Sequence, residues 1–146
     1  MIDTAKLIPR SKPSSLPNDS IKNLNVIKKD VIEIDNKHIG MVIADVSGKG
    51  IGGALMMAVC RSVLQANAQN EYDPSNMLSS LNKTLSVNLA EDMFISMLYM
   101  VLNTQTHLLS YARAGHEAPL ILHKNSDQIN REKTAGIAIG LVCLLY

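Results

Sequence analysis

The sequence predicts an α+β fold, in which antiparallel strands and helices occur in separate blocks along the chain. Short β-branched runs indicate strands before and after one central region, and within that region the apolar residues recur at helical spacing. The predicted order is therefore two strands, two helices and three strands. Because strands and helices do not alternate, this order favours a mainly antiparallel sheet over a doubly wound parallel one.

The first predicted hairpin follows a leading segment rich in proline, serine and asparagine. These turn-forming residues recur through residues 1–25, so we expect a linker or loosely ordered lead-in there and a domain over 26–146. A short apolar strand over 31–34 ends at a turn-prone Asp-Asn-Lys trio. The next strand, over 38–45, is apolar almost throughout, and we expect it to be central and buried.

Two amphipathic helices are predicted next. The first covers about residues 51–68 and follows a loop in which glycine recurs between positions 48 and 53. The second covers about residues 74–89, where Asp73 and Pro74 offer an N-cap and a first-turn proline. Because glycine lets the backbone approach a ligand closely, the loop before the first helix is a candidate binding loop.

The remaining strands follow the helices. We expect a strand over 94–102, a four-residue turn and a return strand over 107–114, which together form a hairpin. A short strand over 119–123 and a polar loop over 124–134 come next. The apolar, strand-like run over 135–146 continues to the last residue, so we expect a domain that is incomplete at its C-terminus.

Composition excludes several classes of function. The 146 residues carry 14 basic and 13 acidic side chains, and only 3% are aromatic, which argues against nucleic-acid binding by a basic or stacking surface. No apolar run approaches the roughly 20 residues of a membrane helix, and no signal-peptide core is present. Cys60 and Cys143 lie in apolar surroundings, which favours buried, reduced thiols in a cytoplasmic protein.

Asp45 is the strongest candidate for chemistry. It ends an apolar strand and enters the glycine-rich loop, where a carboxylate is well placed to hold a hard cation such as Mg²⁺ or Mn²⁺. A strand-end aspartate also commonly caps the following turn, and the spacing alone leaves both interpretations open. A phosphate-binding P-loop is excluded, because Gly50 follows Lys49 where that motif requires serine or threonine.

His116 is the second candidate, at the end of the predicted return strand. A histidine there can act as a metal ligand or a general acid or base, or it can simply pack and form hydrogen bonds. Both interpretations stay open at this point. The other histidines lack the spacing of zinc ligands, and the Gly-x-Ser-x-Gly elbow of serine hydrolases does not occur.

Five sequence motifs occur in an order typical of one protein family. They are IADVSGKG at 43–50, LN at 81–82, MFISM at 93–97, YARAGHEAPL at 111–120 and GIAIGL at 136–141. Over about residues 30–141, the chain therefore resembles the SpoIIE-type PPM phosphatases. These are bacterial metal-dependent serine/threonine protein phosphatases related to the type 2C enzymes.

The resemblance implies a layered β-sandwich flanked by helices, in an α-β-β-α arrangement. It implies two Mn²⁺ or Mg²⁺ ions, which activate a water for attack on a phosphoserine or phosphothreonine. By the same resemblance, Asp45 is the catalytic, metal-bridging carboxylate, and Val46 offers its backbone carbonyl to a metal. We expect four further residues to support the site, namely Gly48, Lys49, Gly50 and His116.

The resemblance also implies partners. The usual substrates are phosphorylated antagonists of anti-sigma factors, so the implied output is sigma-factor regulation, and an upstream sensor domain or protein is expected. An uncovered sheet also favours association, so we expect a tendency to form a homodimer. No nucleic-acid partner and no membrane segment are expected.

Two departures from the family pattern predict weak or absent activity. The family's Gly-Gly-Asp-Tyr-Tyr-Asp-like segment reads Asn-Val-Ile-Lys-Lys-Asp here, so Asp30 is kept and Ile27 replaces a metal-binding carboxylate. The chain also ends at Tyr146, before the family's Thr-Asp-Gly-like motif, so we expect a truncated domain. Asp45 alone cannot hold two ions, because each needs several oxygen ligands. The alternative hypothesis is a non-catalytic, phosphatase-like module that binds a partner protein.

Overall fold

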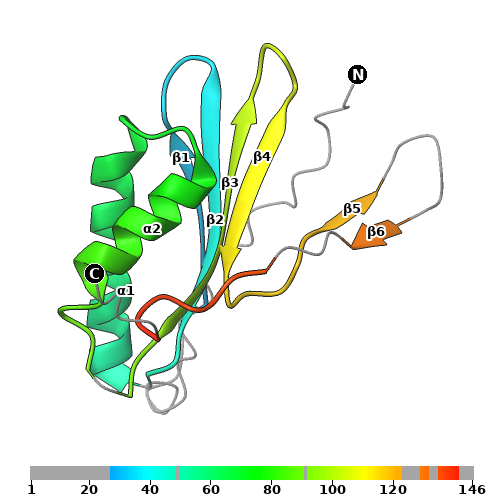
Figure 1. Ribbon diagram of the computed structural model, residues 1–146. Helices are drawn as coiled ribbons and strands as arrows, with labels where there is room; N and C mark the ends of the chain where they lie inside the picture. Colours follow the sequence, from blue (N-terminus) through cyan, green and yellow to red (C-terminus); the bar gives the residue numbers. More distant parts are fainter. Residues whose placement is uncertain (1–26, 49, 91, 123–128, 132–134, 142–146) are drawn as a thin grey trace, which may run out of the picture.

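A four-stranded antiparallel sheet forms the centre of the protein, and two helices cover one of its faces (Figure 1). The computed structural model describes residues 27–48, 50–90, 92–122, 129–131 and 135–141. The strand order in the sheet is β1-β2-β3-β4, the same as the order along the chain. The predicted α+β class and the antiparallel sheet are therefore confirmed.

The pairing of the strands follows two hairpins. β1 (Ile27–Glu33) and β2 (His38–Val46) form the expected first hairpin. β3 (Ile95–Asn103) pairs with β2 along its whole length and turns back into β4 (Leu109–Ala114), an edge strand. β2 is central as expected, but only one of its faces is buried, because alternate residues from Gly40 to Val46 point to the helices.

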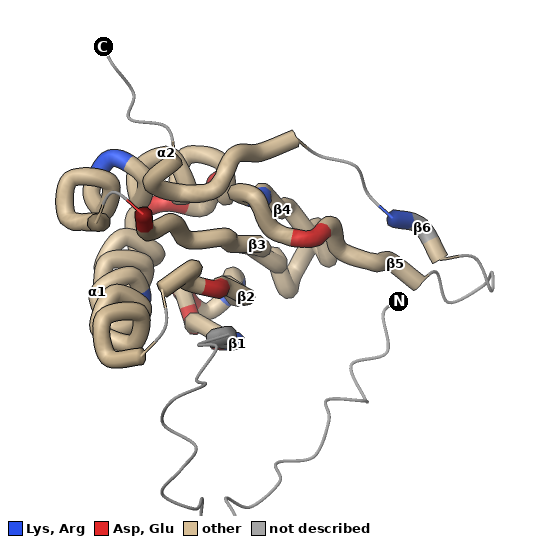
Figure 2. The backbone as a smooth tube through the Cα atoms, turned by 90° about the horizontal axis from the view of Figure 1, so that it is seen from below, with Lys and Arg blue, Asp and Glu red and all other residues tan. Residues whose placement is uncertain are grey.

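The helices lie side by side on the sheet. α1 (Gly50–Ala68) contacts β1 and β2, and α2 (Pro74–Leu85) contacts β3 and β4, as the view from one end of the sheet shows (Figure 2). The Asp73 carboxylate accepts hydrogen bonds from the backbone N–H groups of Ser75 and Asn76, at 2.7 and 3.0 Å, which caps α2 as predicted. Neither described helix is long and apolar enough to cross a lipid bilayer.

The second helix ends four residues before the predicted position. It was expected to continue to residue 89, but the regular helix ends at Leu85, and the next residues form turns. Val87 is 78% exposed there, whereas Leu89 packs against the core and lies under Gly140. The apolar character of Leu89 therefore reflects contact with the C-terminal part of the chain and not a further turn of helix.

The hydrophobic core lies between the helices and the sheet. α1 contributes buried residues at helical spacing, and β3 contributes every second residue. The largest fully buried side chains are Tyr99, Leu64, Met77, Leu81, Leu85, Ile95, Met97, Ile139 and Cys60. The buried surroundings expected for Cys60 are confirmed, and burial raises the pKa of its thiol to about 11. Cys143 lies outside the described residues.

The chain after β4 differs most from expectation. β5 (Leu120–Leu122) is present as predicted, but β6 (Ile129–Arg131), which pairs with it, falls within the expected polar loop. Residues 135–141, which we call the strap, are not a strand, because only Ile139 pairs with the sheet, at Ile95. Gly140 has a φ of +91°, which interrupts extended backbone. The rest of the expected apolar run, 142–146, lies outside the described residues.

Helix α1 begins in close contact with the loop that precedes it. A Cβ atom at Gly53 would lie 2.3 Å from the carbonyl oxygen of Gly48, so the helix can approach the loop only with glycine at that position. Gly52, the preceding residue, faces open space. Packing therefore requires glycine at position 53 but not at position 52.

Removing the Leu81 side chain tests the packing of α2. We expect Leu81→Ala to lower the free energy of unfolding by about 2–5 kcal/mol, because this side chain is fully buried and its removal leaves a cavity. Leu55 in α1 is 63% exposed, so Leu55→Ala should change stability by no more than about 0.5 kcal/mol. Urea denaturation followed by circular dichroism measures both changes, and equal effects would contradict this packing.

Substituting alanine at the two adjacent glycines should give effects of opposite sign. Gly53→Ala should destabilise the protein by about 1–3 kcal/mol, because the new methyl group collides with the Gly48 carbonyl. Gly52→Ala should stabilise it by up to about 0.5–1 kcal/mol, because alanine is the better helix former and meets no neighbour. Thermal unfolding of the two variants provides the comparison, and a harmless Gly53→Ala would show that the loop does not pack on α1.

Candidate functional site

Asp45 lies near the end of β2, on the sheet face that the helices do not cover. Its neighbours Ala44 and Val46 are buried in the core beneath the helices, so the intervening side chain projects to the other face. The carboxylate is half-buried. Its cross-strand partners are Ile27 in β1 and Ser96 in β3. Asp45 therefore occupies an accessible position at one end of the sheet, as a metal ligand at a sheet edge requires.

The loop that follows Asp45 is fastened to β3. The backbone N–H of Ser47 donates to the carbonyl of Phe94 at 3.0 Å, and the Phe94 N–H donates to the Ser47 hydroxyl at 2.9 Å. Gly50 has a φ of +72°, a conformation that glycine adopts without strain. The backbone conformation thus explains glycine at position 50, whereas a Cβ atom at Gly48 would meet mainly the flexible end of the Met93 side chain. Lys49 lies outside the described residues.

His116 is brought to the same end of the sheet by two hydrogen bonds and a turn of the backbone. Its Nδ1 atom lies 2.9 Å from the Ser96 hydroxyl, and Ser96 is the cross-strand partner of Asp45. Arg113 donates to the His116 carbonyl at 2.7 Å, and Gly115 turns the chain with a φ of +61°. The predicted site residues Asp45 and His116 are therefore both held around Ser96.

Ser96 is the residue at this site that sequence reasoning did not single out. It belongs to the quoted MFISM motif, but a serine in an apolar strand carries no functional signal of its own. Its alternation with buried Ile95 and Met97 places it on the uncovered face. Only the pairing of β2 with β3 reveals that Ser96, whose hydroxyl contacts His116, lies across from Asp45.

The strap connects the remaining motifs to this site. The Gly115 N–H donates to the Gly136 carbonyl at 3.0 Å, and Ile139 exchanges two backbone hydrogen bonds of 2.9 Å with Ile95. The Gly140 N–H donates to the side-chain oxygen of Asn82 in α2, at 2.9 Å. The five sequence motifs are thus linked to one another by a continuous series of contacts, through β3 and the strap.

The described residues supply only part of the ligand set for a two-metal centre. In the described ranges, no three His, Cys, Asp or Glu side chains are close enough together to hold a metal ion. Asp30, the other aspartate that the resemblance preserves, is engaged with Arg61 of α1, at 2.5 Å from Oδ2 to Nε. Ile27 stands opposite Asp45 in β1. The described donors therefore do not fit a complete pair of Mn²⁺ or Mg²⁺ sites.

A groove of about 540 Å³ lies elsewhere, between α2, β4 and the strap. Its lining includes Ser79 and Asn82 from α2, Tyr111 from β4 and Ile137 from the strap. Neither Asp45 nor His116 lines it. This groove is thus separate from the residues on which the chemistry would depend.

Comparison with known proteins identifies the family. The sequence profile of stage II sporulation protein E (SpoIIE) matches residues 35–143. The phosphoserine phosphatase RsbU of Bacillus subtilis is 32% identical over 107 residues, which cover 73% of this chain and 32% of RsbU. Protein IcfG of Synechocystis is 27% identical over 141 residues, covering 77% of this chain and 22% of IcfG. The chain thus spans about a third or less of these relatives.

Solved structures share the fold. The RsbU and RsbW domains of a Mycobacterium tuberculosis protein match with a TM-score of 0.71 and 19% identity, over 85% of this chain and 34% of that one. The PP2C phosphatase domain of SpoIIE from Bacillus subtilis, with a fragment of its regulatory domain, matches with a TM-score of 0.68 and 14% identity, over 81% of this chain and 34% of that one. The expected PPM-type architecture is therefore confirmed by the shared PP2C-type fold, and by its sequence the chain belongs to the SpoIIE family.

Proposed function

We propose that this chain carries part of the phosphoprotein phosphatase machinery of its family, with Asp45 as the catalytic and metal-binding carboxylate. The observation that carries the proposal is the meeting of the family motifs around Asp45 at one accessible end of the sheet. A half-buried carboxylate in that position can be reached by a phosphorylated side chain of another protein. The interpretation of Asp45 as a cap of the following turn stays open, because Lys49 of that turn lies outside the described residues.

Mn²⁺ or Mg²⁺ is the cofactor that we assign to the complete site. Asp45 and the backbone carbonyl of Val46 are the ligands that this chain would contribute. When bound, such ions supply an activated water and neutralise charge on the phosphoryl group. Because the described residues do not complete the ligand set, we assign no catalytic step to them and expect hydrolysis by the 146-residue chain to be weak.

The substrate that we propose is a phosphoserine or phosphothreonine on a cytoplasmic protein of the anti-sigma-factor-antagonist type. RsbU is named as a phosphoserine phosphatase, and the Mycobacterium tuberculosis structure contains RsbU and RsbW domains in one chain. These likenesses support a protein substrate within a signalling pathway that regulates a sigma factor. An upstream sensor and a homodimer remain parts of the same proposal.

A non-catalytic binding module is the second candidate function. The register of β1 favours it, because an isoleucine at position 27 stands across from Asp45, where the family places a metal-binding carboxylate. In that case the shape of the domain would be retained for docking a partner protein, without turnover.

Restoring the carboxylate at position 27 separates the two candidates. We expect the 146-residue chain to hydrolyse p-nitrophenyl phosphate in the presence of Mn²⁺ with a turnover number far below the roughly 1–10³ s⁻¹ typical of enzymes. Ile27→Asp should raise the Mn²⁺-dependent rate by about tenfold, equivalent to ~1.4 kcal/mol, because it places a second carboxylate opposite Asp45. The same variants are measured with a phosphoserine peptide, and calorimetry measures Mn²⁺ binding.

Three control variants complete the experiment. Ile27→Asn has the shape of aspartate without its charge and should give no gain, and Asp45→Asn should abolish the gain of Ile27→Asp. Glu33→Gln alters an exposed acid elsewhere on β1 and should change nothing. If Ile27→Asp neither binds Mn²⁺ more tightly nor gains activity, the binding module is favoured. An ordinary turnover by the unmodified chain, lost in Asp45→Asn, would show that the metal site is complete without position 27.

A further inference from the structure

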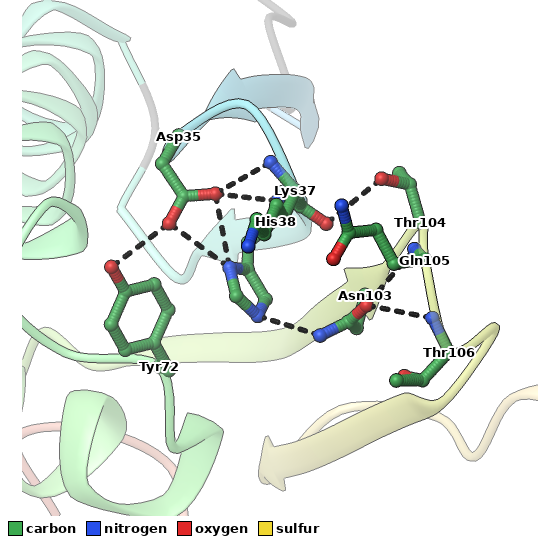
Figure 3. Close-up of polar contacts among 8 residues, drawn as sticks. All are labelled: Asp35, Lys37, His38, Tyr72, Asn103, Thr104, Gln105 and Thr106. Carbon is green, nitrogen blue, oxygen red and sulfur yellow. Dashed lines mark hydrogen bonds and ion pairs between the residues drawn. The ribbon is translucent and has the colours of Figure 1, made fainter.

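A second polar cluster lies at the opposite end of the sheet from Asp45, where it joins three loops (Figure 3). It consists of Asp35 and His38 from the β1–β2 turn, Tyr72 from the α1–α2 connection and Asn103 from the end of β3, and we call it the His38 clasp. His38 and Asp45 are seven residues apart on β2, or about 23 Å along an extended strand. The clasp is therefore independent of the proposed phosphatase site.

The orientation of the Asn103 amide is fixed by its own turn. Its side-chain oxygen accepts hydrogen bonds from the backbone N–H groups of Gln105 at 3.0 Å and Thr106 at 2.9 Å. The amide nitrogen is consequently the atom that faces His38, at 3.0 Å from Nε2. An amide nitrogen can only donate, so the Nε2 atom of His38 must accept.

The other ring nitrogen of His38 faces a carboxylate. Nδ1 lies 3.0 Å from both oxygens of Asp35, so it carries the proton and donates. The Asp35 carboxylate also accepts from the backbone N–H groups of Lys37 and His38, both at 2.7 Å, and from the Tyr72 hydroxyl at 2.9 Å. The Tyr72 ring packs on the imidazole with a centroid distance of 4.6 Å. These contacts define one hydrogen-bond direction, from Asn103 through His38 to Asp35.

From this geometry we infer that the His38 clasp is a pH-responsive link between the β1–β2 and β3–β4 turns, closed when His38 is neutral and opened on the Asn103 side when it is protonated. Protonation places an N–H on Nε2, which then faces the N–H₂ group of Asn103. The amide cannot rotate to present its oxygen without giving up the hydrogen bonds to Gln105 and Thr106. The imidazolium still donates from Nδ1 to the Asp35 carboxylate, so only the contact with Asn103 is lost.

The neighbouring titratable groups keep their charge over the range in which histidine titrates. The hydrogen bond from the Lys37 backbone N–H, followed by the hydrogen bond from the His38 side chain, holds the pKa of Asp35 well below its usual range. The hydrogen bond to Asp35 raises the pKa of Tyr72 above its usual value, so this hydroxyl stays protonated. The β3–β4 turn contacts the ring through the uncharged Asn103. The Nε2 atom of His38, which accepts in the closed clasp, is therefore the position at which the clasp can take up a proton.

The opening is local. The backbone N–H and the hydroxyl of Thr104 both donate to the Lys37 carbonyl, at 2.7 and 3.0 Å, and no titrating group takes part in these bonds. They keep the two turns together when His38 is charged. Protonation of His38 therefore affects the Asn103 side chain alone. It alters the contact of Asn103 with the imidazole and the hydrogen bonds by which Asn103 caps its own turn.

Nuclear magnetic resonance of the full chain tests the inference directly. Experiments are made in a His107→Asn background, because His107 adjoins the same turn, and asparagine tolerates its φ of +58°. At pH 8, the ¹⁵N shifts should identify His38 as the Nδ1–H tautomer. As the pH falls to 5, the amide shifts of Gln105 and Thr106 should change with the same midpoint as the His38 ring.

A substitution at position 103 should reverse the response. In Asn103→Asp, one carboxylate oxygen can still cap the turn, while the other accepts a proton from Nε2 of charged His38. We expect the midpoint of the His38 titration to rise by about one pH unit or more, and the clasp to stay closed in acid. Tyr72→Phe keeps the ring contact and leaves both imidazole nitrogens with their partners, so its midpoint should move by no more than about 0.3 pH units.

Two results would overturn the inference. One is an Nε2–H tautomer for neutral His38, which would reverse the direction of the hydrogen bonds. The other is a midpoint in Asn103→Asp that moves no further than that of Tyr72→Phe. If Asn103→Asp fails to fold, the tautomer and the shared titration of the amides in the unsubstituted turn still decide the question.

Discussion

β2 and β3 pair along their full lengths, from His38 opposite Asn103 at one end to Val46 opposite Ile95 at the other. This register places Ser96 beside Asp45, and Asn103 beside His38. Because successive side chains on a strand point to opposite faces, a slip of one residue would send Asp45 and Ser96 to different faces and would expose the core residues of β3. Both polar clusters thus depend on the pattern of burial that fixes this pairing, and neither could form in another register.

The helices and the strap maintain the end of the sheet that contains Asp45. α1 starts directly after the loop that follows Asp45, and its close approach at Gly53 holds this loop in place. α2 contributes Asn82, which binds the strap at Gly140, and the strap in turn pairs with β3 at Ile95. A displacement of either helix would therefore change the surroundings of Asp45, although neither helix contributes a described ligand.

Local signals predicted most of the fold. The first helix was placed to within one residue at its start, because the change from glycine loop to helical spacing is abrupt, and both ends of β3 were placed to within one residue. The end of α2 was missed because Leu89 continues the apolar spacing but packs beneath the strap. β6 was missed because a three-residue strand in a polar segment has no periodicity to detect. Asp45 and His116 were identifiable from the family motifs, whereas Ser96 and the His38 clasp depend on contacts between distant segments.

The glycines of the strap and of the turn before His116 have a consequence for the history of the domain. A Cβ atom at Gly115 would lie 2.7 Å from that of Ala138, and one at Gly136 would lie 1.9 Å from the Arg113 carbonyl oxygen. Selection for a stable fold is enough to retain glycine at these places, whether or not the domain hydrolyses phosphate. The Arg-Ala-Gly-His signature therefore reports the shape of this turn, and its presence in a sequence does not by itself reveal whether a domain hydrolyses phosphate.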